Sequence, residues 1–234
     1  MSKVLVTIPA YNEAENIINV VNNIVVNQYD YVIINDCSTD TTKNICMENG
    51  YSFINLPVNL GIGGAIQCGY QYALDNDYDI AVQFDGDGQH NADYISYLLE
   101  PIERGDADMV IGSRFCNSNR NGFQSSLMRR IGIYIIKCVI HLCCGAKVTD
   151  STSGFRAVNK SLIRHFAHEY ANDYPEPEAI VSAVFNGYKI VEVPVEMNER
   201  VGGESSINAI RAMYYMIKVP LALAIFRLSM RRAR

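Results

Sequence analysis

Residues 85–90, DGDGQH, carry two carboxylates and an amide within one short segment that follows an apolar run. Carboxylate and amide oxygens are the ligands that Mg²⁺ and Mn²⁺ prefer, so Asp85, Asp87 and Gln89 could hold one such ion together with the oxygens of a diphosphate. Two aspartates at this spacing more often form an ordinary surface turn. The position directly after a run typical of a strand instead favours a functional site, and the segment predicts a divalent-metal site.

Two more polar segments follow apolar runs, at residues 9–13 (PAYNE) and 35–40 (NDCSTD). Ligands bind at the carboxyl ends of the strands of an open parallel sheet, so all three polar segments are expected at one edge. Asp36 could simply lie in a turn, because residues 38–40 are of types that cap helices. Its position at a strand end favours a ligand-binding role.

The elements that must position these segments alternate along residues 1–112. Short runs rich in β-branched residues predict strands at 4–8, 31–34, 52–56, 80–84 and 109–111. Apolar residues at helical spacing predict helices around 17–24, 61–76 and 95–102. This alternation predicts an α/β fold with a parallel sheet covered by helices on both faces.

The second half of the chain has a different pattern. The expected elements are a polar loop at 116–126, a long apolar helix at 127–144, a helix at 174–186, an alternating strand at 191–197 with one buried face, and a last helix from 206 onward. Pro220 is expected to kink that last helix.

The composition excludes several classes of protein. A chain of 234 residues that is 49% hydrophobic is neither disordered nor a small disulfide scaffold, and one domain is expected. The seven cysteines form no CxxC pair, as is typical of reduced thiols. The first residues lack the pattern of a secretory signal, so we expect a cytoplasmic protein.

The net charge of −5 hides an asymmetry, because residues 1–112 carry −13 and residues 113–234 carry +8. The acidic half suits a divalent cation, and the basic half suits phosphate or an anionic surface. Nucleic acid is not an expected partner, because the basic residues are mixed with apolar stretches and no nucleic-acid-binding motif is present.

Two apolar helices carry basic residues at their edges: Arg129, Arg130 and Lys137 in the first, and several residues from Arg211 onward in the last. Neither contains the roughly 20 apolar residues needed to span a bilayer. Such helices can lie on a membrane surface, which predicts a peripheral membrane protein. The same stripes could instead be ordinary core, and the last helix could close a homo-oligomer.

Seven segments, in order, resemble the inverting family 2 glycosyltransferases of GT-A fold, and within them the dolichol-phosphate mannosyltransferase-like, polyprenyl-phosphate branch. They are IPAYNEAENI (8–17), INDCSTDTT (34–42), NLGIGGA (59–65), QFDGDGQH (83–90), VIGSRF (110–115), VTDSTSGFRA (148–157) and VEVPVEMNERVGGESS (191–206). The resemblance implies a Rossmann-like, mostly parallel sheet in a single domain. Residues 1–115 would bind a nucleotide sugar, residues 116–205 the acceptor, and residues 206–234 would form an amphipathic helix on the membrane surface.

The resemblance also implies roles for individual residues. The donor would be held by Pro9, Ala10, Tyr11, Glu13, Asp36, Asp85 and Gly86, the metal by Asp85, Asp87 and Gln89, and the phosphate groups by Arg114, Arg129, Arg130 and Arg200. Asp87, Arg114 and Arg200 would be the catalytic residues. The chain departs from the family at Asn35 and Cys37, where Asp and then Gly or Asn are common, so the identity of the base stays open.

The implied reaction moves a sugar from a UDP- or GDP-sugar to a polyprenyl or dolichyl phosphate at the cytoplasmic face of the membrane, with Mg²⁺ or Mn²⁺ stabilising the leaving diphosphate. An ionised phosphate acceptor needs no strong base. A hydroxyl acceptor on a glycan or lipid-linked saccharide would need one, and Glu176, Glu178 and Asp150 are the candidates.

Two other classes have less support. A sugar-1-phosphate nucleotidyltransferase would carry a glycine-rich signature after the first strand, where this chain has PAYNE. A non-catalytic sugar-nucleotide-binding module need not keep metal ligands, yet Asp85, Asp87 and Gln89 are all present.

Overall fold

The computed structural model describes residues 2–116, 127–198, 218–223, 225 and 227. Its strands are β1 (Val4–Ala10), β2 (Asp30–Asn35), β3 (Phe53–Asn55), β4 (Ile80–Gln83), β5 (Met109–Ser113), β6 (Arg156–Asn159) and β7 (Ile190–Pro194). Its helices are α1 (Ile17–Val26), α2 (Thr42–Glu48), α3 (Gly61–Asp75), the short 3₁₀ helix η1 (Ala92–Tyr94), α4 (Ile95–Glu103), α5 (Leu127–Cys144), α6 (Lys160–His168) and α7 (Pro175–Phe185).

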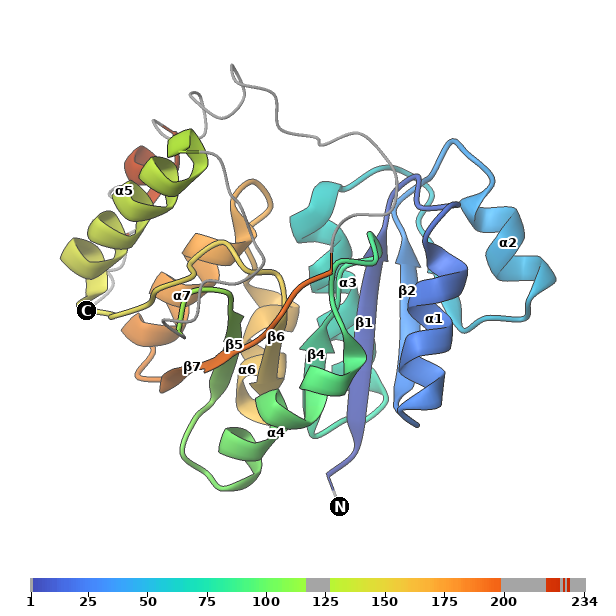
Figure 1. Ribbon diagram of the computed structural model, residues 1–234, viewed down its shortest axis with the longest axis horizontal. Coiled ribbons are helices and arrows are strands. Elements are labelled where there is room, and N and C mark those ends of the chain that lie inside the picture. The colour runs from blue at the N-terminus through green and yellow to red at the C-terminus, as the bar shows by residue number, and fades with distance from the viewer. Residues whose placement is uncertain (1, 117–126, 199–217, 224, 226, 228–234) are drawn as a thin grey trace.

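The strands form one mixed sheet in the order β3-β2-β1-β4-β6-β5-β7, with helices on both faces (Figure 1). All neighbouring strands are parallel except β6, which is antiparallel to β4 and β5. The chain builds outward from β1 to β3 and then returns to place β4 on the other side of β1. Between β1 and β4 lies the switch point at which open α/β sheets bind ligands.

Two apolar clusters cover the two faces of the sheet. Ile66 of α3, Phe166 of α6 and Ile180 of α7 belong to one cluster and are fully or almost fully buried. Ile24 of α1 and Leu98 of α4 belong to the other and are also fully buried. Because both faces are covered, the strand ends are the part of the sheet left available for binding.

The strands expected in residues 1–112 are confirmed, and so are the helices expected at 127–144 and 174–186. The expected mostly parallel sheet is confirmed, and β6 is the strand that reverses direction. Sequence patterning missed β6 because the strand is short and starts with a charged residue, Arg156. It missed α6, which begins where the Asn159 side chain accepts a hydrogen bond from the Leu162 amide at 3.0 Å.

Two other expectations have a mixed outcome. Strand β7 ends at Pro194, and its residues 190–193 are half-buried rather than alternating between a buried and an exposed face. Of the last helix, residues 218–223, 225 and 227 are described, and they are helical. The rest of that prediction lies outside the described residues, as does nearly all of the expected polar loop. No described helix has both the length and the apolar character to cross a bilayer.

The glycine-rich start of α3 allows a close approach that a larger residue would prevent. A Cβ built on Gly63 would lie 2.2 Å from the backbone oxygen of Ala171 and 2.6 Å from Cα of Asn172. Backbone atoms of a packed loop cannot move aside cheaply. We expect Gly63→Ala to destabilise the protein by about 1–3 kcal/mol, the usual cost of overpacking. Thermal unfolding measures this, and an unchanged Tm would contradict the packing of α3 against residues 171–172.

Candidate active site

The segment after β1 is connected by hydrogen bonds to the segment after β2. Asn12 has the left-handed φ of 58°. Its backbone N–H donates to Oγ of Ser38 at 3.0 Å, and its Oδ1 accepts from the amide of Thr39 at 2.8 Å. The Glu13 amide donates to Oγ1 of Thr42 at 2.9 Å. The two polar segments therefore form one surface, as the sequence predicts.

Asp36 is buried within this polar surface. Its Oδ1 accepts a hydrogen bond at 2.7 Å from the backbone amide of Leu60, the residue just before α3. Its own amide donates to the Ala10 carbonyl at 2.9 Å. Tyr11, in contrast, is half-exposed beside it. Asp36 thus links the carboxyl end of β1 to the start of α3 through its hydrogen bonds.

The segment after β4, residues 85–90, is called the acidic loop here, and it packs directly against the end of β1 and the segment that follows it. A Cβ on Gly86 would lie 3.0 Å from the Pro9 carbonyl oxygen and 3.5 Å from Cγ of Glu13. Within the loop, Oδ1 of Asp87 accepts a hydrogen bond from the backbone N–H of Gln89 at 3.1 Å. The backbone carbonyl of Gln89 accepts one from the backbone N–H of Asn198 at 2.8 Å. The three predicted polar segments are therefore brought together at the switch point.

The carboxylate of Asp85 lies next to two polar side chains. Its Oδ2 lies 3.1 Å from Nε2 of His90, and its Oδ1 lies 3.5 Å from Nε2 of Gln83. Burial favours the neutral acid, but the field of His90, with help from Gln83 and Arg156, outweighs it and holds the pKa of Asp85 below its usual value. Asp85 is therefore ionised at neutral pH, as a metal ligand must be.

Arg156 is the functional candidate that the sequence did not reveal. It is 1% exposed, and its guanidinium donates to the carbonyls of Ser151, Ser153 and Glu176 at 2.7–3.2 Å. Its charge lowers the pKa of Asp85. The signal in the sequence is a single charge within the otherwise apolar run GFRAV. In the structure, Arg156 lies directly opposite Gln83 in the sheet.

The three candidate bases occupy different settings. Burial raises the pKa of Glu176, the Arg156 guanidinium opposes this, and the Asp85 carboxylate adds to it, so Glu176 belongs to the electrostatic environment of the acidic loop. Asp150 is fully buried and accepts two hydrogen bonds from the Arg114 guanidinium, at 2.7 and 2.8 Å. That pairing is the geometry of a structural ion pair, and it also commits one edge of Arg114 to Asp150 instead of to a phosphate.

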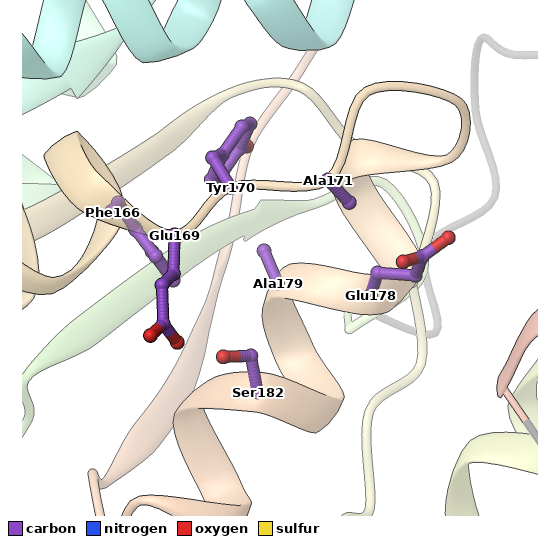
Figure 2. Close-up of a pocket in the computed structure, with 7 residues that line it drawn as sticks. All are labelled: Phe166, Glu169, Tyr170, Ala171, Glu178, Ala179 and Ser182. Carbon is purple, nitrogen blue, oxygen red and sulfur yellow. The ribbon is translucent and has the colours of Figure 1, made fainter. Parts of the chain in front are cut away.

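Glu178 lines a cavity of about 250 Å³ between the end of α6 and α7 (Figure 2). The other lining residues are Phe166, Glu169, Tyr170, Ala171, Ala179 and Ser182. Burial raises the pKa of Glu178, and the carboxylate of Asp173 raises it further. The electrostatic partners of Glu178 and Glu176 thus differ: Asp173 for the first, Arg156 and Asp85 for the second.

Arg200 lies outside the described residues, as do the side chains of Arg129 and Arg130 on α5. Their proposed contacts with phosphate stay predictions.

The acidic loop fits a divalent cation of the oxygen-binding kind. Asp85, Asp87 and Gln89 supply carboxylate and amide oxygens. A Cβ on residue 154 would lie 2.6 Å from Oδ2 of Asp85, so the glycine at this position leaves room for the carboxylate. No cluster of three or more His, Cys, Asp or Glu residues that could enclose a metal occurs in the described part of the chain. Mg²⁺ is typically held by one or two carboxylates plus substrate phosphates, and this loop can offer such a half-site.

The fold and this acidic strand-end site define a glycosyltransferase of GT-A type. The chain resembles the glucosyl-3-phosphoglycerate synthase of Mycobacterium tuberculosis, solved with Mn²⁺, uridine diphosphate and phosphoglyceric acid. The TM-score is 0.70 at 18% identity, over 97% of this chain and 78% of that one. At that identity the likeness establishes the fold alone.

The sequence relationship is closer. A UDP-N-acetylglucosamine–dolichyl-phosphate N-acetylglucosaminyltransferase of Methanococcus voltae is 35% identical over 81% of this chain and 83% of its own length. An undecaprenyl-phosphate mannosyltransferase of Micrococcus luteus is 27% identical over 88% of each chain. The family described as Glycosyl transferase family 2 matches residues 5–166. The chain belongs to this family and is a glycosyltransferase.

The raised pKa of Glu178 makes a prediction about stability. A carboxyl whose pKa is higher in the folded state stabilises the fold below its unfolded value, near 4.5, and this contribution is lost as the pH rises through the folded value. We therefore expect Glu178→Gln to match the wild-type Tm near pH 4 and to exceed it near pH 8. The exposed Glu169→Gln serves as the control. Equal effects of Glu178→Gln at both pH values would contradict the inferred burial.

Proposed function

We propose that this enzyme transfers a sugar from a nucleoside-diphosphate sugar to the phosphate of a polyprenol, with Mg²⁺ or Mn²⁺ bound at the acidic loop. The observation that carries the proposal is the meeting of the segments after β1, β2 and β4 at the switch point. There a Cβ on Gly86 would lie 3.0 Å from the Pro9 carbonyl oxygen, and the Asn12 backbone N–H donates a hydrogen bond to Ser38. Relatives named for dolichyl phosphate and undecaprenyl phosphate support this acceptor class.

The donor would lie across the three segments. In this arrangement the nucleoside contacts Pro9, Ala10, Tyr11, Glu13 and Asp36, and the diphosphate lies over residues 85–89. The structural neighbour solved with uridine diphosphate and Mn²⁺ supports a nucleotide and a divalent ion in this fold. The neutral Asn35, which donates to Oδ1 of Asn55 at 2.6 Å, leaves the choice between UDP and GDP donors open.

Negative charge develops on the diphosphate as the glycosidic bond breaks. A divalent ion supplies Lewis-acid stabilisation of that charge when bound. Asp87 and Gln89 would hold the ion, and Asp85 would complete the half-site. Arg200, Arg129 and Arg130 would contribute positive charge to the donor and acceptor phosphates.

The acceptor phosphate would attack the anomeric carbon from the side opposite the leaving group, which inverts its configuration. A phosphate monoester is already ionised near neutral pH, so no side chain has to remove a proton. The commitment of Asp150 to Arg114 agrees with a reaction that needs no base there. Positioning and charge stabilisation would supply the catalysis.

The test of this proposal is release of nucleoside diphosphate from several UDP- and GDP-sugars, with and without a short polyprenyl phosphate and with and without Mn²⁺ or Mg²⁺. We expect release from one donor that requires both the lipid phosphate and the metal. Release that needs a saccharide with a free hydroxyl, and not the lipid phosphate, would contradict the acceptor class.

Removing one proposed metal ligand should abolish turnover while the fold survives. We expect Asp87→Ala to lower kcat by at least about 100-fold, because the developing diphosphate charge loses its stabilisation. Asp106→Ala, an exposed carboxylate between α4 and β5, is the matched control. Steady-state kinetics with saturating metal measures the difference, and near-normal turnover of Asp87→Ala would remove that residue from the mechanism.

We further propose that α5 and the described part of the last helix rest on the membrane surface. Val219 and Leu223 are buried in the same cluster as Ile136, Ile140 and Cys143 of α5. The Arg227 guanidinium donates to the Leu142 carbonyl, which joins the ends of the two segments. Apolar side chains nevertheless stay exposed on both: Tyr134, Ile135, Leu142, Leu221 and Ile225.

An exposed apolar surface with nearby cations predicts binding to anionic lipid. We expect cosedimentation with anionic liposomes at low salt, less at high salt, and less again for the double variant Leu142→Ser/Leu221→Ser. Neutral liposomes provide the control for charge. Indifference of the wild-type protein to anionic liposomes at low salt would contradict membrane attachment.

A further inference from the structure

The carboxylate of Asp85 lies against residues to which neither the family match nor the proposed reaction gives a role. Oδ2 of Asp85 lies 3.1 Å from Nε2 of His90. A carboxylate only accepts hydrogen bonds, so Nε2 must carry the proton in this contact. The other ring nitrogen, Nδ1, is buried and has no hydrogen-bond partner among the described residues. Within that part of the chain, the imidazole hydrogen-bonds to Asp85 alone.

The imidazole of His90 is fixed by aromatic packing. Its ring lies nearly parallel to the ring of Phe155, with centroids 4.8 Å apart and an interplanar angle of 20°. Phe84 meets it edge-on at 5.4 Å and 76°. The side chain of His90 is only 3% exposed. A ring confined in this way presents its Nε2–H in one direction, toward Asp85.

Gly154 leaves room for the carboxylate. A Cβ there would lie 2.6 Å from Oδ2 and 2.9 Å from Oδ1 of Asp85. It would also lie 3.0 Å from Nε2 of Gln83. Real side-chain carbons do not approach so closely, so any residue larger than glycine would displace the carboxylate. The next residue in the chain, Phe155, is the one that stacks on His90.

We propose that His90 is a positioning residue that orients the Asp85 carboxylate for the divalent cation, with Phe155 fixing the imidazole and Gly154 leaving room for the carboxylate. This inference rests on the proposed function, because it assumes a metal at Asp85. Partners that orient metal-binding side chains typically change metal affinity 10–100-fold when they are lost. A histidine that served only to fill space beside Phe155 would have no such effect.

The experiment separates the hydrogen bond from the packing. His90→Phe keeps an aromatic ring beside Phe155 and removes the donor, whereas His90→Gln keeps an N–H donor at the position of Nε2 and removes the ring. The readout is the dissociation constant of Mn²⁺, from electron paramagnetic resonance of free Mn²⁺, in the presence of UDP and, separately, of GDP. His168→Phe, on an exposed histidine of α6, is the control.

We expect His90→Phe to weaken Mn²⁺ binding by about 10–100-fold, with His90→Gln closer to the wild type. Mn²⁺ affinity unchanged in His90→Phe would overturn the inference, as would a larger loss in His90→Gln than in His90→Phe. If the wild-type protein itself binds no Mn²⁺ with either UDP or GDP, it is the proposed function that fails.

Gly154→Ala provides a second test, in case His90→Phe does not fold. Its added methyl group would displace the carboxylate that lies within 3 Å of it, so Mn²⁺ binding should weaken while the circular dichroism spectrum is kept. Wild-type Mn²⁺ affinity in folded Gly154→Ala would contradict the proposed positioning of Asp85.

Discussion

The active site depends on keeping carboxylates close together at one edge of the sheet with Asp85 ionised. The charge of Asp85 contributes to the raised pKa of Glu176. The Arg156 guanidinium acts to lower the pKa of both residues. Burying a guanidinium is costly unless its donors are satisfied, and three backbone carbonyls around Arg156 satisfy them. The positive charge under the sheet edge is thus held in place by the backbone itself.

The antiparallel strand β6 brings this charge to the site. Because β6 runs against β4, Arg156 lies opposite Gln83, and the residues just before Arg156 reach the end of β4 where Asp85 begins the acidic loop. A parallel strand at this position would have placed its beginning at the far edge of the sheet. The single reversal in the sheet therefore joins the acidic loop after β4 to the segment 151–156. The same segment meets Glu176 at the start of α7 through the Arg156 hydrogen bond.

Much of the structure of residues 1–112 could be predicted from the sequence. Its strands are apolar runs that end in polar clusters, and parallel strands necessarily bring those clusters to one edge. The second half was harder to predict, because β6 is four residues long and starts with a buried charge that interrupts the apolar pattern. The pairing of Arg114 with Asp150 joins residues 36 positions apart and leaves no local signal. The orientation of His90 depends on Phe155, a contact that only the fold creates.

The central claim is that the sugar ends on the phosphate of a polyprenol. Mass spectrometry of the lipid recovered after reaction with the donor sugar and Mn²⁺ tests this most directly. We expect a new lipid, heavier by one sugar residue that is joined through a phosphodiester; this lipid should be absent when the metal is chelated and absent with Asp87→Ala. Donor turnover with an unmodified polyprenyl phosphate, or a sugar attached to a hydroxyl group, would contradict it.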